Sequence, residues 1–444
     1  MHTSRIEMLG SFESTFQPHL DVDVAETTEH IQRWSEDLAM LYGAGVRRLR
    51  YPIRWHRVER EPGVHDWRET DAILGRMQEL GMRPVVDLVH HTSYPRWLER
   101  GFAEPGFRDA YMRYVEAFAE RYPWVPDYTL FNEPFSTLFL CSHEGLWPPY
   151  TKGLQSFIAM VRNVLPAVAE ASRMYRDLLP DGRHVWIDAC ERHTSAGPAG
   201  DVFVEVANDR RFFVIDTFLG HALDARRPFL ERVVRAGGED LFDIEPGHID
   251  VLGLDYYAHC QWSFHSEHRG SVPTPSPPPL HELIEEYADR YGRPCMLSET
   301  NIRGYASDRA SWLRYTLEQC EIAQTRGVEI DGYCWFPSID SCDWDSLLYR
   351  CEGNVDPVGV WWLDEHLDRR ESVMSRAFKQ VVRGASAAEL PAYRFRPPVS
   401  TWLEGYLPHM RHWDWIDPPE EPDSCEEDPS LRMELRIVEA ADAG

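Results

Sequence analysis

The stretch GVRRLRYPI, residues 45–53, and the stretch GMRPVVDLVH, residues 81–90, frame one repeat of the pattern that decides the fold. Each begins with a glycine, the residue that most readily ends a preceding helix, and continues as a short β-branched strand. The segment between them, Trp67–Leu80, has the apolar spacing of an amphipathic helix. Strand, helix and strand in this order predict a βαβ unit with parallel strands.

The same alternation runs through most of the 444 residues. Further helices are predicted at Thr28–Tyr42, Pro105–Tyr122, Gly153–Leu179 and Ala306–Arg326. The predicted strands are Ile6–Ser14, Val46–Ile53, Arg83–His90, Asp127–Asn132, His184–Ala189, Ile249–Tyr256, Pro294–Ser298 and Asp331–Phe336. Eight strands separated by helices predict an α/β fold, and specifically a closed (β/α)8 TIM barrel rather than an open doubly wound sheet.

The chain is expected to form a single barrel domain with a C-terminal addition. The barrel is assigned to residues 1–385, an extension packed on it to 386–416, and a flexible acidic tail to 417–444. The tail is predicted because the stretch from Asp417 to Asp428 holds seven acids and no base. The proline-rich segment Ser271–Pro279 is expected to be a rigid loop without regular structure.

Charge and composition exclude several classes of partner. The 73 acids and 46 bases give a formal net charge of -27, which argues against nucleic acid or an anionic membrane as partner. No apolar run approaches the ~18 residues of a membrane span, and the N-terminus shows no secretory pattern, so a cytoplasmic location is expected. No Cys-x-x-Cys pair, metal-ligand spacing or glycine-rich phosphate loop occurs, so no cofactor and no metal are expected. A homo-oligomer remains possible on the sequence alone.

Two glutamates stand where a barrel places its reactive groups, at the C-terminal ends of strands. The fourth predicted strand leads into Phe131-Asn132-Glu133-Pro134, and the seventh into Leu297-Ser298-Glu299-Thr300. Paired carboxylates are what cleavage of a glycosidic bond requires, one to protonate the leaving oxygen and one to attack or to activate water. The alternative is that both are ion-paired surface acids, of which the chain has many. Their joint position on two strands favours the catalytic interpretation.

Six sequence blocks resemble the motifs of glycoside hydrolase family 1, and they follow one another along the chain in the same order as in the family. Glu133 and Glu299 lie in segments similar to its T-x-N-E-P and I/V-T-E-N-G motifs. The other blocks are Leu49–Val58, Val89–Leu98, Gly253–Tyr257 and Trp335–Trp344, which are similar to Y-R-F-S-I-x-W-x-R-I, L-Y-H-W-D-L-P-x-W-L, G-x-N-Y-Y and W-S-L-x-D-N-x-E-W. The resemblance covers roughly residues 6–365 and implies a retaining β-glycosidase acting on a small carbohydrate substrate.

The resemblance also implies a catalytic role for each of five residues. Glu133 would be the general acid/base, which needs a raised pKa, and Glu299 the nucleophile, which must stay ionised. Arg50 is the implied cation beside the nucleophile, and Tyr257 the implied phenolic donor. Asn132 would hydrogen-bond the sugar 2-hydroxyl, a contact that strengthens in the transition state.

Five further residues are implied to bind the sugar. Gln17 and His91 would bind ring hydroxyls, Trp335 would be the aromatic platform beneath the ring, and Trp344 a second wall. Asp343 takes the place of a sugar-binding glutamate. Because an acid is kept there and no Lys is near, a neutral hexoside is favoured over a phosphorylated one.

The blocks also depart from the family pattern. Asp255 replaces an Asn, Thr92 replaces a Trp, and Trp335 to Asp340 is one residue longer than the family spacing. Two alternative functions remain open: a transglycosylase that uses the same carboxylates, and a barrel that binds sugar without turnover. The 16 Trp suit either a sugar site or an aromatic core.

Overall fold

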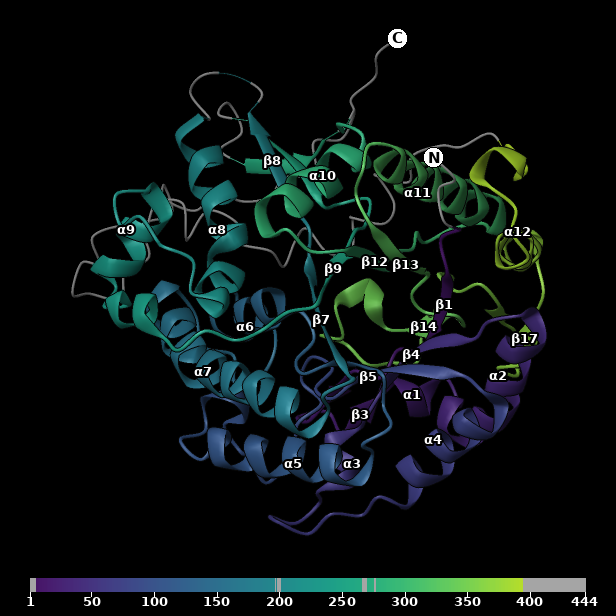
Figure 1. The fold of residues 1–444 in the computed structure, drawn as a ribbon, viewed down its shortest axis with the longest axis horizontal. Helices are drawn as coiled ribbons and strands as arrows, with labels where there is room; N and C mark the ends of the chain where they lie inside the picture. Colours follow the sequence, from purple (N-terminus) through teal and green to yellow (C-terminus); the bar gives the residue numbers. More distant parts are fainter. Residues whose placement is uncertain (1–4, 196, 198–200, 266–269, 275–276, 394–444) are drawn as a thin grey trace.

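Eight parallel strands close into a barrel in the computed structural model, which describes residues 5–195, 197, 201–265, 270–274 and 277–393. Around the barrel the strands follow the order β1-β13-β12-β9-β7-β6-β5-β4 (Figure 1). Their bounds are β1 Met8–Ser11, β4 Arg48–Pro52, β5 Arg83–Asp87, β6 Asp127–Thr129, β7 Arg183–Ala189, β9 Val251–Asp255, β12 Cys295–Glu299 and β13 Ile330–Cys334. Each falls within or overlaps one predicted strand, so the predicted (β/α)8 TIM barrel is confirmed.

Helices surround the barrel (Figure 1). The longer ones are α2 His30–Ala44, α4 Arg68–Leu80, α5 Phe107–Arg121, α7 Leu154–Leu178, α8 Asp201–Leu219, α10 Leu280–Tyr291, α11 Ala306–Thr325 and α12 Val373–Val382. Shorter helices are α1 Val24–Thr27, α3 Trp55–Val58, α6 Pro134–Ser142 and α9 Pro228–Arg235. Gly45 and Gly81 end α2 and α4 with φ of 101° and 66°, the left-handed conformation that a side chain disfavours.

Four small sheets lie outside the barrel. They pair β2 Phe16–Gln17 with β3 Val22–Asp23, β14 Ser341–Cys342 with β15 Val355–Asp356, β16 Trp362–Leu363 with β17 Arg369–Arg370, and β10 Gln261–His265 with both β8 Arg192–Ser195 and β11 Gly270–Pro273. The prediction that the whole proline-rich segment lacks regular structure was wrong, because residues 271–273 belong to β11. This is an edge strand, where a proline can sit without costing the sheet a hydrogen bond.

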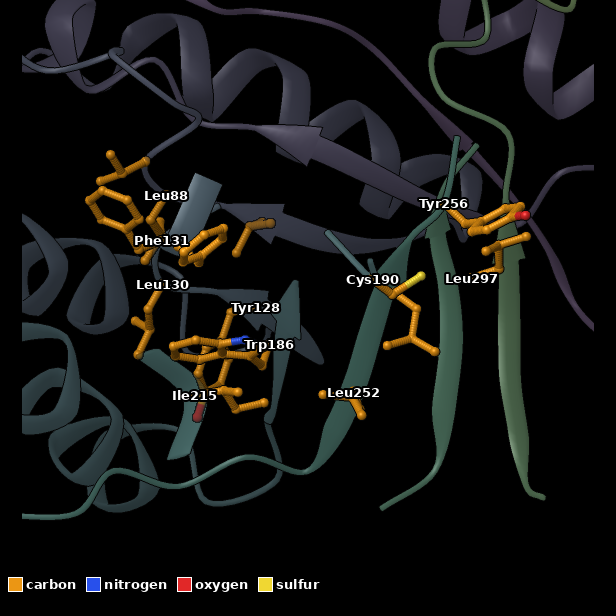
Figure 2. Close-up of a cluster of buried hydrophobic side chains, with 14 of the residues drawn as sticks. Leu88, Tyr128, Leu130, Phe131, Trp186, Cys190, Ile215, Leu252, Tyr256 and Leu297 are labelled. Carbon is orange, nitrogen blue, oxygen red and sulfur yellow. The ribbon is translucent and has the colours of Figure 1, made fainter. Parts of the chain in front are cut away.

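The hydrophobic core has two parts. A small cluster made only of barrel-strand residues fills the centre of the barrel: Leu9, Val85, Val185, Ile187, Val251, Met296 and Cys334. A larger cluster packs the outside of the strands against the helices, and Figure 2 shows part of it, with Tyr128, Trp186 and Leu252 from three adjacent strands. Most of the aromatic residues serve this second layer.

Ion pairs cover the end of the barrel opposite the site. Arg48 lies 2.7 Å from Asp127 and 2.7 Å from Asp331, and Arg183 is paired with the same two aspartates. These residues sit at or near the first positions of their strands, where bulky charged groups close the barrel floor. The opposite end, where the strands finish, is thereby left for the site.

The C-terminal extension is described only as far as residue 393. Its short 3-10 helix, Ala387–Glu389, lies against α11, since the Ala387 N–H donates to Glu321 Oε1 at 3.0 Å, and Leu390 is buried. The predicted remainder of the extension, 394–416, and the predicted tail, 417–444, lie outside the described residues. Among the described helices, none combines the length and apolarity needed to cross a membrane.

Candidate active site

Glu133 is held at the barrel mouth by backbone hydrogen bonds from both neighbouring strands. Strand β6 ends at Thr129, but the Asn132 N–H still donates to the Val89 carbonyl at 2.9 Å and the Glu133 N–H to the Ile187 carbonyl at 2.9 Å. Glu133 has a φ of 42°, in the left-handed region that costs a non-glycine residue free energy. Pro134 then begins α6. The chain thus turns sharply at Glu133. Strained backbone conformations of this kind are often found at functional sites.

Glu299 is the last residue of β12, and donors hold both of its carboxylate oxygens. The Arg50 guanidinium donates to Oε1, and the Tyr257 hydroxyl donates to Oε2 at 2.5 Å. Arg50 is itself fixed by Asp87 at 2.9 Å and by Asn132 Oδ1 at 2.6 Å. Four of the predicted catalytic residues therefore form one connected network. Charge-assisted hydrogen bonds of this kind stabilise an ionised carboxylate.

Glu133 lies in an environment that opposes its ionisation. Burial, together with the negative charges of Asp255 and Glu299, raises the pKa of Glu133 well above its ordinary value. Burial and the charge of Glu299 also raise the pKa of Asp255, whose Oδ1 accepts a 2.6 Å hydrogen bond from Ser298. The two catalytic candidates thus differ in the way acid and nucleophile must differ, one held protonated and the other ion-paired.

His91 lies beside the acid in a second strained turn, with a φ of 48°. Its Nδ1 is 2.9 Å from the Thr137 hydroxyl and its Nε2 is 3.8 Å from Glu133 Oε2. Burial and the nearby charge of His90 hold the pKa of His91 well below its usual range, so the ring is neutral. The rings of Trp147 and Trp344 have centroids 5.0 and 5.7 Å from that of His91.

A single cavity joins these groups at the C-terminal ends of the strands. Its lining combines Glu133 and Glu299 with two further glutamates and with aromatic, apolar and polar side chains. The lining residues are Glu13, His91, Glu133, Phe135, Ser136, Phe139, Leu140, Trp147, Ala189, Glu191, Arg210, Tyr257, His259, Cys260, Glu299, Asn301, Arg303, Phe336, Pro337, Ser341, Trp344, Leu347 and Val358. Of the predicted sugar-binding residues, His91 and Trp344 lie on this wall. Trp344 Nε1 has no hydrogen-bond partner within the part of the chain that the structure describes.

Phe336 occupies the wall where the platform was predicted at Trp335. Trp335 is fully buried, is absent from the lining, and donates its indole N–H to the Val358 carbonyl at 2.8 Å. The Phe336 ring lies over the Arg50 guanidinium, 4.9 Å from its central carbon to the ring centroid. The extra residue before Asp340 moves the aromatic position by one, so counting back from Asp340 at the family spacing would have found Phe336. Phe336, and not the predicted Trp335, therefore contributes the aromatic side chain of the cavity wall at this strand end.

Asp343 also differs from its predicted place. It is buried, is not on the cavity wall, and has both carboxylate oxygens occupied by the backbone N–H groups of Glu352, Gly353 and Asn354, at 2.9–3.1 Å. Its structural surroundings are those of a residue that shapes a loop. Gln17 is buried in β2 outside the lining, and its Nε2 has no partner among the described residues.

Glu13 is a lining residue that the sequence reasoning missed. It follows β1 by two positions and lies in the block containing Gln17, but no family motif marks it. An acid just past a barrel strand was the available signal. No cluster of three or more metal-ligating side chains occurs among the described residues.

A barrel with two carboxylates at its strand ends is the arrangement that retaining glycosidases use, and the sequence comparisons identify the family. The profile of Glycosyl hydrolase family 1 matches residues 11–275. The chain therefore belongs to glycosyl hydrolase family 1 and is a glycoside hydrolase that acts on carbohydrate.

Characterised relatives are distant but extend along most of the chain. Beta-glucosidase A of Thermotoga maritima is 22% identical over 77% of this chain and 83% of its own length. A beta-glucosidase of an Agrobacterium species is 24% identical over 71% of this chain and 77% of its own length. The solved beta-glucosidase from Thermotoga maritima in complex with glucoimidazole superposes with a TM-score of 0.72 at 18% identity, covering 86% of this chain and 98% of the other. That structure supports the fold.

Proposed function

We propose that this enzyme hydrolyses β-glycosides of neutral hexoses with retention of configuration, through a covalent glycosyl intermediate on Glu299. The observation that carries the proposal is the contrast between the two glutamates. Arg50 and Tyr257 hold Glu299 as an oriented carboxylate, while burial and neighbouring acids favour the protonated form of Glu133. A retaining enzyme needs this division of roles.

In the first step, Glu133 gives its proton to the glycosidic oxygen while Glu299 attacks the anomeric carbon. The bond to the leaving alcohol breaks and a glycosyl–Glu299 ester forms. In the second step, the Glu133 carboxylate takes a proton from water, whose oxygen displaces Glu299. The sugar is released with its original anomeric configuration, and Glu133 is again protonated.

Three other residues would support these steps. Arg50 pairs with one oxygen of the Glu299 carboxylate, and Tyr257 would orient the other. Arg50 donates to Asn132 Oδ1, so Nδ2 is the donor end of this amide, and it lies 3.4 Å from His91 Nε2. We assign the Nδ2 amide group to the sugar 2-hydroxyl. Phe336 and Trp344 would form apolar walls for the faces of the sugar ring.

Proton NMR of the first-formed product tests the mechanism. An aryl β-glucoside hydrolysed in D₂O should release the β-anomer first, with the α-anomer appearing only by mutarotation. An α-anomer formed first would contradict retention. Glu299→Gln should abolish turnover, whereas Glu116→Gln, at an exposed position on α5, should leave it unchanged.

Transglycosylation uses the same two carboxylates, and its products distinguish it from hydrolysis. With methanol added, a hydrolase should release mainly free sugar, and a transglycosylase mainly the methyl glycoside. A barrel that only binds sugar would release no nitrophenol from an activated aryl glycoside.

A further inference from the structure

Glu13 is one of four glutamates that line the cavity, and it lies on the side of the barrel away from Glu133 and Glu299. The fourth, Glu191, is ion-paired with Arg210 at 3.2 Å. Glu13 lies two residues beyond β1 and is 5% exposed. In the barrel order, β13 separates β1 from β12, and β4 and β5 separate it from β6. Glu13 is therefore not placed to act at the anomeric carbon, which must lie between Glu133 and Glu299.

One oxygen of Glu13 is fixed by its own turn. Oε1 accepts the Ser14 N–H at 2.8 Å, the Thr15 N–H at 2.7 Å and the Thr15 hydroxyl at 2.7 Å. His90 Nε2 approaches the same oxygen at 3.2 Å. Within the described part of the chain, every hydrogen bond to this carboxylate goes to Oε1. The side chain is thus held rigidly, and Oε2 is the oxygen left for a ligand in the cavity.

The neighbours of Glu13 keep it charged. Burial alone would raise the pKa of Glu13, but His90 outweighs it and lowers the pKa to about 2. Burial likewise disfavours the His90 cation, yet Glu13 and Asp87 raise the pKa of His90 to about 10. His90 Nδ1 lies 2.8 Å from Asp87, which also binds Arg50. Glu13 therefore presents a fixed negative acceptor to the cavity.

Asp343 does not offer such an acceptor to the cavity, because it is buried away from the cavity wall and its carboxylate accepts hydrogen bonds from three backbone N–H groups there. A sugar bound here still needs a strong acceptor for its hydroxyl donors, and a preorganised carboxylate is among the strongest. Glu13 supplies one from a different strand of the same barrel mouth.

We propose that Glu13 is the specificity-determining carboxylate of the glycone site, with Oε2 accepting a hydrogen bond from a hydroxyl remote from the anomeric carbon. It selects neutral glycones that carry a hydroxyl at this position and rejects glycones bearing a carboxylate or phosphate there. The proposal rests on the β-glycosidase activity proposed above.

A double-mutant cycle with deoxy substrates tests it. The wild type and Glu13→Gln are compared on 4-nitrophenyl β-glucoside and on its 3-, 4- and 6-deoxy analogues. One missing hydroxyl should lower the wild-type kcat/KM by roughly 10- to 100-fold, the range of a hydrogen bond to a charged group. Glu13→Gln should lower kcat/KM for the parent substrate by a similar factor. On the one analogue that lacks the contacted hydroxyl, Glu13→Gln should lower kcat/KM little further. Equal effects of Glu13→Gln on all four substrates, or no effect, would overturn the proposal.

Asp343→Asn is the matched control and should show no coupling with any deoxy substrate. A second measurement needs no variant: the wild type should prefer 4-nitrophenyl β-glucoside to the β-glucuronide by at least roughly 100-fold, whereas comparable rates would contradict the proposal. A wild type inactive on every aryl β-glycoside would instead overturn the proposed function, and this inference with it.

Discussion

The Tyr257 hydroxyl donates a 2.5 Å hydrogen bond to Oε2 of Glu299, the oxygen that Arg50 does not contact. Burial and the negative charge of Glu299 raise the pKa of the phenol well above its ordinary value, so Tyr257 acts as a donor throughout the physiological range. Between them, Tyr257 and Arg50 orient the carboxylate without a covalent constraint. The hydrogen bond between Tyr257 and Glu299 joins the loop after β9 to the end of β12.

Removal of this hydroxyl should slow the reaction more than it weakens binding. Tyr257→Phe is expected to lower kcat by roughly 10- to 100-fold, because an oriented hydrogen bond to a charged group is lost at the reacting atom. Steady-state kinetics on an aryl β-glucoside measure the change. A variant with wild-type kcat and only a raised KM would contradict this role.

Phe336, rather than Trp335, is expected to contact the sugar. Phe336→Ala should raise KM by roughly tenfold, because the sugar loses an apolar wall. Trp335→Phe should leave KM nearly unchanged and lower the unfolding midpoint instead, since it removes the indole hydrogen bond to the Val358 carbonyl. A larger increase in KM for Trp335→Phe than for Phe336→Ala would support Trp335 as the aromatic platform beneath the sugar.

Asp343 should matter for stability more than for glycone choice. Asp343→Ala leaves the N–H groups of Glu352, Gly353 and Asn354 without their acceptor. Because these three residues are exposed, water replaces part of the lost bonding, and we expect a loss of about 1–3 kcal/mol in total. Urea unfolding should show a reduced free energy of unfolding. Unchanged stability combined with altered preference between glucoside and galactoside would contradict the loop-shaping role.

The pH dependence of kcat/KM should depend on Asp255. In the proposed mechanism the protonated form of Glu133 is the active acid, so activity should fall as the pH rises through the Glu133 pKa. Asp255 contributes to raising that pKa, and its removal makes the Glu133 carboxylate easier to form. Asp255→Asn should therefore move the alkaline limb to lower pH. An alkaline limb that does not move, or one that moves upward, would contradict the assignment.

Much of the barrel could be predicted because each strand and helix carries its own local signal. Strand β4 and helix α4 follow directly from apolar spacing and from the glycines that end the preceding helices. Side-chain placement at the mouth depends instead on single-residue shifts. One extra residue after β13 exchanges Trp335 for Phe336 on the wall, although both are aromatic.

The roles of other acids depend on partners that are distant in sequence. Asp343 meets three N–H groups contributed by residues 352–354, and Glu13 meets His90 from another strand end. Neither contact leaves a pattern in the residues around the acid itself. Glu133 and Glu299, the proposed catalytic residues, are easier to predict because the barrel sets their position at the strand ends.

Covalent labelling tests whether Glu299 is the nucleophile. The enzyme is incubated with 2,4-dinitrophenyl 2-deoxy-2-fluoro-β-glucoside, whose fluorine slows breakdown of the intermediate, and the protein is analysed by mass spectrometry. We expect a stoichiometric burst of dinitrophenol and one fluoroglucosyl group, located on Glu299 after peptide mapping. Label on a different residue, or turnover of the parent glucoside with no adduct ever formed, would contradict the assignment of Glu299 as the nucleophile.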